Sequence, residues 1–338
     1  MNPMHIVKFL KKIVIVLTVS LICVSCRYLP ELSYNPWEVV ATGTQANLAD
    51  IAFTGTNPQR GWVVGSDATL LETTDGGDHW DVKQLDLGGE KVRFNSISFN
   101  GAEGWIVGLP SILLHTTNEG ETWDRILLNA KLPGGPYSIE ALSPNTAEMT
   151  TDLGAIYQTE DGGKTWTALV EDAVGFVRNL SRAEDGRYIS VSAKGNFYST
   201  WEPGSQAWEP HNRFSSKRLE KIGFGQDGRL WMIARGGELR FTDPENATEW
   251  GEPINPEYST SWGFLDLAYR TPEEIWVSGG SGNLLCSLDG GKTWQKDGSV
   301  QNVPSNLYKI KFLDSEQGYV LGQRGALLRY QGSTPKTA

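Results

Sequence analysis

The chain has 338 residues, of which 39% are hydrophobic, and its formal net charge is −10. This length is ample to bury a core. The acidic balance, with no interleaving of basic and aromatic residues that would stack bases, argues against a nucleic-acid partner. Three cysteines occur in the whole chain, too few for a disulfide framework, so the core must be held by packing alone.

The first 25 residues have the pattern of a signal peptide. Lys8, Lys11 and Lys12 precede an apolar stretch of about a dozen residues, which is short for a membrane span and typical of a secretory signal. The stretch ends at Ser25-Cys26, which looks like a bacterial lipobox, although Cys23 stands where Leu is usual. We expect cleavage before Cys26 and acylation of that residue, which would anchor the chain to a membrane. An ordinary signal peptide and an uncleaved anchor are the alternatives.

Seven tryptophans recur along the rest of the chain at steps of 43, 43, 43, 42, 42 and 44 residues. They are Trp37, Trp80, Trp123, Trp166, Trp208, Trp250 and Trp294. A period in the forties with one aromatic position per repeat is typical of a β-propeller. Each repeat also contains apolar-alternating segments separated by Gly, Asp and Asn turns, which predict four short antiparallel strands.

A turn of the form Ser/Thr-x-Asp-x-Gly-x-Thr-Trp, the Asp-box, precedes several of these tryptophans. It is intact before Trp80, Trp166 and Trp294, whereas Asn118 replaces the Asp in the second copy. We expect the Asp carboxylate to accept backbone N–H groups of its own turn, and the tryptophan to pack between blades. The motif therefore predicts a fold, and it does not indicate a metal site.

Counting the strands predicts how the ring closes. The sequence contains seven three-strand units, and a fourth strand is expected to begin at each of the seven tryptophans. The first tryptophan, Trp37, precedes all of the units, whereas the last unit, which ends near Tyr330, has no tryptophan after it. We therefore expect an all-β, seven-bladed propeller at residues 37–331 whose N-terminal strand completes the C-terminal blade. Residues 26–36 read as a lipidated tether and residues 332–338 as a disordered tail. The three-strand units begin near Asp50, Ser96, Ser138, Phe176, Glu220, Phe264 and Tyr308.

Charge is unevenly distributed over the repeats. Residues 178–240 carry eleven Lys or Arg against seven Asp or Glu, while the rest of the processed chain is strongly acidic. Propeller connectivity places several of these cations in loops of one face, which predicts a basic surface for an acidic or anionic partner. Arginines predominate, which favours bidentate contacts with carboxylates or phosphates. The candidate partner-binding residues are Arg178, Arg182, Lys194, Arg213, Lys217, Arg218, Lys221, Arg235 and Arg324.

No set of catalytic residues emerges from the sequence. The four histidines are far apart and lack metal-ligand spacing, and Cys286 sits in an apolar segment that indicates a buried structural thiol. We therefore expect no enzyme activity, metal or cofactor. Glycoside hydrolysis needs only two carboxylates, so an exported glycan-binding or glycan-cleaving propeller is the alternative, with Trp201 and Trp262 as candidate sugar platforms.

The whole pattern resembles the photosystem II stability and assembly factors of cyanobacteria and chloroplasts. The resemblance rests on Ser25-Cys26, the Gly-Trp-x-Val-Gly strands at Trp62 and Trp105, the Asp-boxes, and the phrase that begins at Asn35. It implies a non-enzymatic, monomeric scaffold anchored on the lumenal side of the thylakoid membrane. Its implied partners are newly made D1, including the D1 precursor, and early reaction-centre intermediates, bound through the arginine-rich face.

Overall fold

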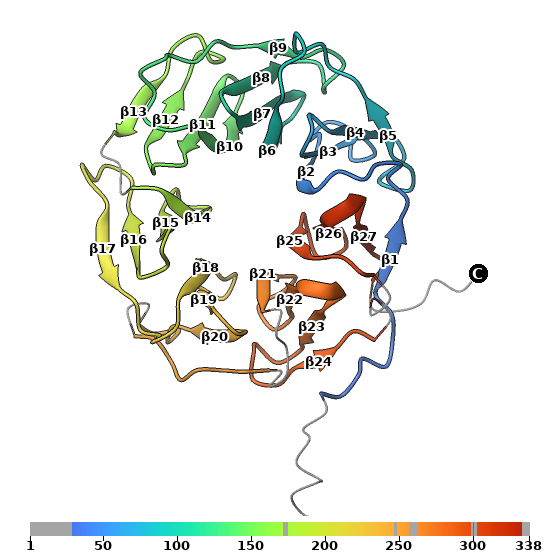
Figure 1. The fold of residues 1–338 in the computed structure, drawn as a ribbon, viewed down its shortest axis with the longest axis vertical. Coiled ribbons are helices and arrows are strands. Elements are labelled where there is room, and N and C mark those ends of the chain that lie inside the picture. The colour runs from blue at the N-terminus through green and yellow to red at the C-terminus, as the bar shows by residue number, and fades with distance from the viewer. Residues whose placement is uncertain are drawn as a thin grey trace, which may run out of the picture.

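The computed structural model describes a ring of β-sheets arranged around a central channel (Figure 1). The described residues are 29–171, 175–246, 249–256, 263–298, 300 and 303–332. The signal segment, Cys26, Trp262 and residues 333–338 of the expected tail therefore lie outside the described residues.

Each blade is an antiparallel sheet that runs from an innermost to an outermost strand, and the blades follow one another in chain order. Blades 1 to 3 are β2 (Leu48–Phe53), β3 (Gly61–Gly65), β4 (Leu70–Thr73), β5 (Asp81–Lys83); β6 (Arg93–Asn100), β7 (Glu103–Leu109), β8 (Ile112–Thr116), β9 (Asp124–Arg125); and β10 (Pro136–Ser143), β11 (Thr146–Thr151), β12 (Ile156–Thr159), β13 (Thr167–Val170). Blades 4 to 6 are β14 (Val177–Arg182), β15 (Tyr188–Ser192), β16 (Phe197–Trp201), β17 (Glu209–Asn212); β18 (Leu219–Phe224), β19 (Leu230–Ala234), β20 (Glu238–Phe241); and β21 (Phe264–Tyr269), β22 (Ile275–Gly279), β23 (Leu284–Ser287), β24 (Gln295–Lys296).

The seventh blade combines the two ends of the propeller, as the sequence predicts. Strands β25 (Leu307–Phe312), β26 (Gly318–Gly322) and β27 (Leu327–Tyr330) are completed by β1 (Trp37–Val40), which pairs with β27 in the register Trp37 to Tyr330. Short 3-10 turns, η1 (Gly280–Gly282) and η2 (Gln323–Gly325), join the second and third strands of blades 6 and 7. The N-terminal strand therefore covers an edge that the C-terminal blade would otherwise expose.

The fifth blade departs from the expected fourth strand at Trp250. Its sheet has three strands, and two isolated bridges, Leu239 to Ile254 and Thr242 to Trp250, take the place of the outer strand among the described residues. This blade also has the degenerate turn Asp243-Pro244, in which proline offers no N–H for a regular ladder. The tryptophan is nevertheless buried, because it packs against Tyr198 of blade 4.

Seven apolar clusters form the core, and each lies between two neighbouring blades. The periodic tryptophan of each blade packs against the preceding blade: Trp80 of blade 1 contacts Tyr319 of blade 7, and Trp166 of blade 3 contacts Trp105 of blade 2. Trp37 follows the same rule, since it meets Trp276 of blade 6 at a ring-centroid distance of 5.3 Å. The packing therefore confirms that Trp37 belongs to the seventh blade.

Every innermost strand has a β-bulge near its start, and in six of the seven blades the polar residue after the bulge contacts the next blade. Asp50 after the first bulge accepts from Ser96 and from the backbone N–H of Ile97. The polar residue after the bulge makes a corresponding contact between most other pairs of neighbouring blades. At the junction of blades 3 and 4, the Tyr137 hydroxyl donates instead to the carbonyl of Arg178. These residues, set 43 or so positions apart, tie the blades together around the channel: Asp50, Ser96, Asn179, Lys221, Asp266 and Lys309.

The Asp-box turns have the expected local geometry. In the third box, the Asp161 carboxylate accepts the backbone N–H and the hydroxyl of Thr165 at 2.9 and 2.7 Å, and the Thr159 hydroxyl accepts the N–H of Gly163. Gly163 has a φ of +82°, a conformation that an L side chain rarely adopts. Thr165 lowers the pKa of Asp161 to about 2 through these hydrogen bonds, so the carboxylate is ionised at neutral pH.

The expected tether is packed against the propeller over its last part. Pro30 and Leu32 exchange backbone hydrogen bonds with Lys296 of the short outer strand β24, at 2.9 Å each. Leu29 and Leu32 pack on the apolar clusters beside blade 6. The segment expected to be a tether is therefore packed on the propeller at residues 29–32, because two leucines find apolar neighbours there.

Removing residues 34–41 should unfold or oligomerise the domain, because it takes away β1 and leaves both β27 and the Trp276 pocket uncovered. Size-exclusion chromatography and thermal unfolding would measure this, with a chain lacking residues 333–338 as the control. A cooperative, monomeric propeller without residues 34–41 would contradict the closing role of β1.

The Asp-boxes should contribute acid-sensitive stability. The pKa of Asp289, which burial raises and hydrogen bonds from Thr293 lower, is also about 2, against an ordinary value of 3.8. A carboxylate whose pKa is lower in the folded state stabilises above about pH 4, and that contribution disappears as the pH falls toward 2. We therefore expect Asp161→Asn with Asp289→Asn to lower the melting temperature at pH 7 and to reduce the further loss between pH 4 and 2.5.

Asparagine is a suitable replacement, because Asn118 already occupies this position in the second box. Its Oδ1 accepts the backbone N–H of Thr122 at 3.0 Å. The double Asp→Ala variant, which removes the acceptor altogether, should be less stable than the Asn variant at every pH. An Asn variant that loses as much stability as the wild type on acidification would contradict this account.

Candidate functional site

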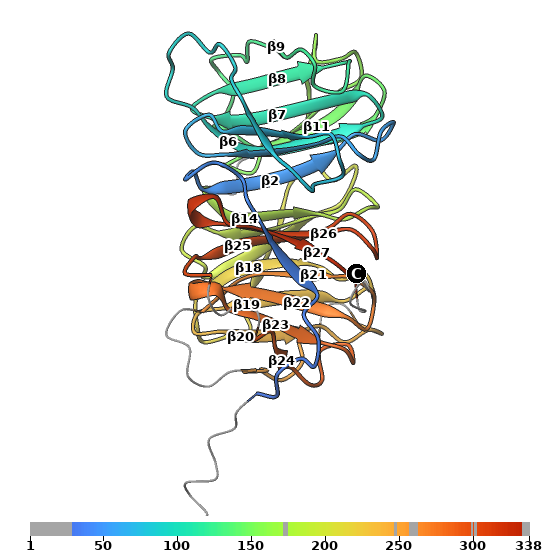
Figure 2. The same ribbon diagram turned by 90° about the vertical axis from the view of Figure 1, so that its right-hand side faces the viewer.

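The propeller has two faces with different chemistry. The entry face consists of the loops that lead into the innermost strands and the turns between second and third strands, including η1 and η2. The Asp-box face carries the turns between first and second and between third and fourth strands. Viewed edge-on, η1 and η2 project from one side of the ring, as the orange and red coils at the left of Figure 2.

Six of the predicted cations meet on the entry face, where blades 4 and 5 adjoin. We call them the blade 4–5 cluster. Arg178 donates from Nε and Nη2 to the carbonyl of Ala193, at 3.2 and 3.0 Å, beside Lys194. The N–H of Arg235 donates to the carbonyl of Arg218 at 2.8 Å. Backbone contacts therefore hold the loops of the cluster together: Arg178, Lys194, Arg213, Lys217, Arg218 and Arg235.

Two carboxylates contact this cluster and neutralise it only in part. Glu220 is shared by Arg178 and Arg218, each at 2.8 Å. Glu238 lies 3.3 Å from Lys217 and is also bound by Arg240. Burial raises the pKa of Glu238, but hydrogen bonds from Ser215, Arg240 and Lys217 outweigh it and lower the pKa, so the group stays ionised. Positive charge therefore exceeds the negative charge in contact with it.

Three cations of the cluster form no ion pair within the described ranges. Lys194 and Arg235 are exposed in the tight turns between second and third strands of blades 4 and 5. Arg213 is half-buried, and its Nη1 lies 3.5 Å from the carbonyl of Gly195. These three side chains are available to a carboxylate from outside, because no charge in the described part of the propeller engages them.

Three other predicted residues lie elsewhere. Arg182 ends β14, four residues from Arg178 and toward the Asp-box face, where it pairs with Glu148 at 2.8 Å. Lys221 points across to blade 6 and pairs with Asp266 at 2.7 Å. Arg324 lies in η2 of blade 7, far around the ring from blades 4 and 5 (Figure 1). Arg182 and Lys221 line the central channel, but each is paired with a carboxylate of an adjacent blade and therefore adds little free positive charge to the blade 4–5 cluster.

Cations outnumber carboxylates in the lining of the central channel, but most of these cations are held in ion pairs within the ring. It encloses about 870 Å³ and is lined by residues of the innermost strands. Lys309 and Lys311 lie 2.6 and 3.4 Å from Asp50, and although burial alone would raise the pKa of Asp50, the two lysines hold it well below its usual range. The lysines therefore help to hold blades 7 and 1 together, and they leave one positive charge in excess over Asp50.

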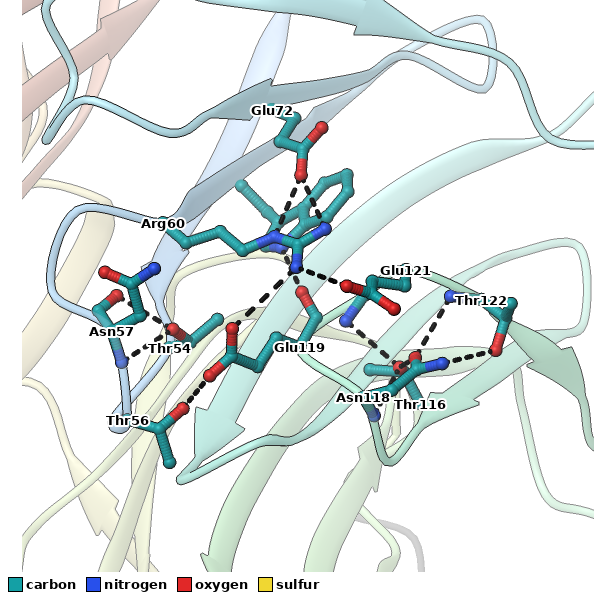
Figure 3. Close-up of polar contacts among 12 residues, drawn as sticks. Thr54, Thr56, Asn57, Arg60, Glu72, Thr116, Asn118, Glu119, Glu121 and Thr122 are labelled. Atoms are coloured by element: carbon teal, nitrogen blue, oxygen red, sulfur yellow. Dashed lines mark hydrogen bonds and ion pairs between the residues drawn. The ribbon is translucent and has the colours of Figure 1, made fainter.

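On the Asp-box face, an arginine joins neighbouring blades (Figure 3). Arg60 of blade 1 binds Glu72 at 2.8 Å and reaches Glu121, in the Asp-box of blade 2, at 3.4 Å. Glu119 of the same box contacts Thr56 and lies 3.8 Å from Arg60. Arg329 likewise contacts Asp78 in the box of blade 1. Arg60 and Arg329 are thus engaged in holding neighbouring blades together.

Two further cations on the entry face were not predicted. Lys91 and Arg93 are exposed where the chain enters blade 2, and the described residues provide neither with an ion pair. They line a shallow depression with Asp67 and Asp152. Arg93 precedes its strand's bulge at the same position as Arg218, which alignment of the repeats would have revealed. Both residues lie outside the basic segment 178–240, so the distribution of charge along the sequence gives no signal for them.

The candidates for other chemistry have local structural roles. His115 bonds Glu103 at 2.7 Å and stacks on Trp105, and His211 bonds Thr200. Within the described ranges, no three His, Cys, Asp or Glu side chains are grouped so as to hold a metal ion. Cys286 is fully buried, and burial raises the pKa of its thiol. Trp201 is also buried, so the expectation that it is an exposed sugar platform is wrong.

Among the residues that the structure describes, no helix has the length and apolar character needed to cross a membrane. The expected lipid site, Cys26, lies outside the described residues.

Comparisons with known proteins agree with the fold and identify the family. Residues 29–331 match the family described as "Photosynthesis system II assembly factor YCF48". The "Photosystem II assembly lipoprotein Ycf48" of Trichormus variabilis is 61% identical over 99% of this chain and 98% of its own length. A solved structure described as "YCF48 bound to D1 peptide" has a TM-score of 0.88 and 54% identity, covering 90% of this chain and all of that one. YCF48 from Cyanidioschyzon merolae has a TM-score of 0.81 and 38% identity over 88% of this chain and 98% of that one. The chain therefore belongs to the Ycf48 family of photosystem II assembly factors.

Proposed function

We propose that this chain is a non-enzymatic scaffold in photosystem II assembly, and that it binds newly made D1 or its precursor through the blade 4–5 cluster. The observation that carries the proposal is the local excess of cations: six gather at one junction, and two carboxylates contact them. The family supports the assembly role, and a relative of 54% identity has been solved with a D1 peptide.

The chemistry of the cluster suits a carboxylate-bearing peptide. Arginine guanidinium groups present several N–H donors in a plane and can bind a carboxylate with two parallel hydrogen bonds. Arg213 and Arg235 can do so without breaking an ion pair of the described fold, whereas Arg218 would have to bind the peptide and Glu220 at the same time. An acidic segment of D1 or of an early reaction-centre intermediate would therefore bind mainly to Lys194, Arg213 and Arg235.

The proposed place of action is the lumenal side of the thylakoid membrane. Curated relatives are named lipoproteins, and this chain has Ser25-Cys26 at the end of its apolar leader. Acyl chains on Cys26 would hold the propeller at the membrane surface, close to the lumenal segments of its partner. The packed residues 29–32 then fix where the anchor leaves the propeller, beside blade 6.

Charge reversal separates this proposal from the glycan alternative. Arg213→Glu with Arg235→Glu should weaken binding of an acidic D1 lumenal peptide at least about tenfold, because each charge-assisted hydrogen bond contributes about 1.5 kcal/mol or more. Isothermal titration would measure the affinity, and D1 recovered in pull-downs from detergent-solubilised membranes would fall in parallel.

The matched control is Lys164→Glu with Lys292→Glu. It makes the same change in net charge at two exposed Asp-box turns on the other face. Both double variants should keep the wild-type melting temperature, since none of the four side chains has an ion pair in the described structure. A docking site at blades 4 and 5 would be contradicted if both double variants lost D1 binding equally, or if neither variant lost it. Binding of oligosaccharides in place of the peptide would favour the alternative.

A further inference from the structure

Two phenylalanine rings are exposed on the blade 4–5 surface. Phe176 is 64% exposed and Phe214 is 55% exposed, and they are the only aromatic members of the six exposed large hydrophobics in the described part of the chain. The remaining four belong to outer strands, an Asp-box turn and the loop after β9: Val39, Val82, Leu127 and Leu288. Aromatic residues and arginines are both enriched in protein interfaces, and here they occur together in the same loops of one face.

The backbone holds both rings in place beside the cations. The carbonyl of Phe176 accepts the N–H of Ala193, whose own carbonyl binds the Arg178 guanidinium. Phe214 stands between Arg213 and the buried Ser215, and the Ser215 hydroxyl accepts the N–H of Lys217 at 3.0 Å. Both rings are therefore presented to solvent by loops with fixed partners, and binding through them would cost little ordering.

We propose that Phe176 and Phe214 are apolar anchors of the docking surface, so that it selects an extended acidic peptide with bulky apolar side chains between its carboxylates. The inference rests on the proposed function, since it concerns the same surface. Carboxylates of such a peptide would bind Lys194, Arg213 and Arg235, while its apolar side chains would cover the two rings. The cations would then attract acidic peptides in general, and the two rings would favour those acidic peptides that also carry bulky apolar side chains.

A peptide fits this surface better than an anionic bilayer does. Glu220 and Glu238 lie among the cations and would repel a continuous layer of negative headgroups. A peptide can place each carboxylate opposite a free cation and leave these two positions without charge.

Two synthetic peptides of equal length and charge test the inference on the full chain in detergent. The first alternates Asp or Glu with Leu, and the second has Ser in place of every Leu. Wild-type protein should bind the Leu peptide about tenfold more tightly, as expected for partly covering two aromatic rings. Phe176→Ala with Phe214→Ala should abolish that preference while leaving the affinity for the Ser peptide unchanged. Leu288→Ala, an exposed apolar residue on the opposite face, is the matched control and should change neither.

The outcomes separate the two proposals. If wild-type protein binds neither peptide, the docking function itself fails. If it binds both and the phenylalanine variant keeps the Leu preference, the anchor role is overturned and the docking function stands. Vesicles with about 30% anionic phospholipid give the remaining outcome: loss of vesicle binding in the variant, with unchanged peptide binding, would show that the rings serve a membrane contact instead.

Discussion

The structure depends on the pairing of β1 with β27. A propeller buries its core between blades, so every blade must have a neighbour on both sides, and only short sheet edges remain at the rim of the ring. The register of Trp37 with Tyr330 joins residues almost 300 positions apart, and the Trp37 ring fills the space beside Trp276. The four-residue strand β1 thereby closes the seven sheets into one ring. This ring holds the loops of blades 4 and 5 in position.

Around the channel, a second set of contacts supports the ring. After six of the seven bulges, one polar residue contacts the next blade, as Asp50 accepts the N–H of Ile97 and Asp266 accepts the N–H of Ile310 at 2.9 Å. Arginines on the Asp-box face perform the same task at the outer turns (Figure 3). Most of the Lys and Arg side chains in the described residues are therefore engaged in internal ion pairs, so those that are not engaged carry the functional argument.

Local chemistry made the fold predictable from the sequence. The tryptophan period, the Asp-box turns and the strand count each depend on residues close together in the chain, and they gave the blade number and the mixed closing blade correctly. The tryptophan period could not predict that blade 5 lacks a regular fourth strand. Trp250 keeps its packing role in this blade, although only two isolated bridges take the place of the strand's hydrogen-bond ladder.

The site was predictable only in part, because its ion pairs form between residues of neighbouring blades that are far apart in the sequence. Arg182 and Lys221 look like free cations in the sequence, yet Glu148 and Asp266, each more than 30 residues away, neutralise them. The polar residues after the bulges differ in type, so their shared role was not apparent before the register was known. The two exposed rings were also hidden, since a phenylalanine near a strand is usually a core residue.

Hydrogen exchange of the full chain with and without a D1 lumenal peptide tests the central claim most directly. The account predicts that the peptide slows exchange in the entry-face loops of blades 4 and 5, at residues 193–195, 213–218 and 235–237, while the Asp-box turns are unchanged. Protection confined to the Asp-box face, or to the channel strands, would contradict it.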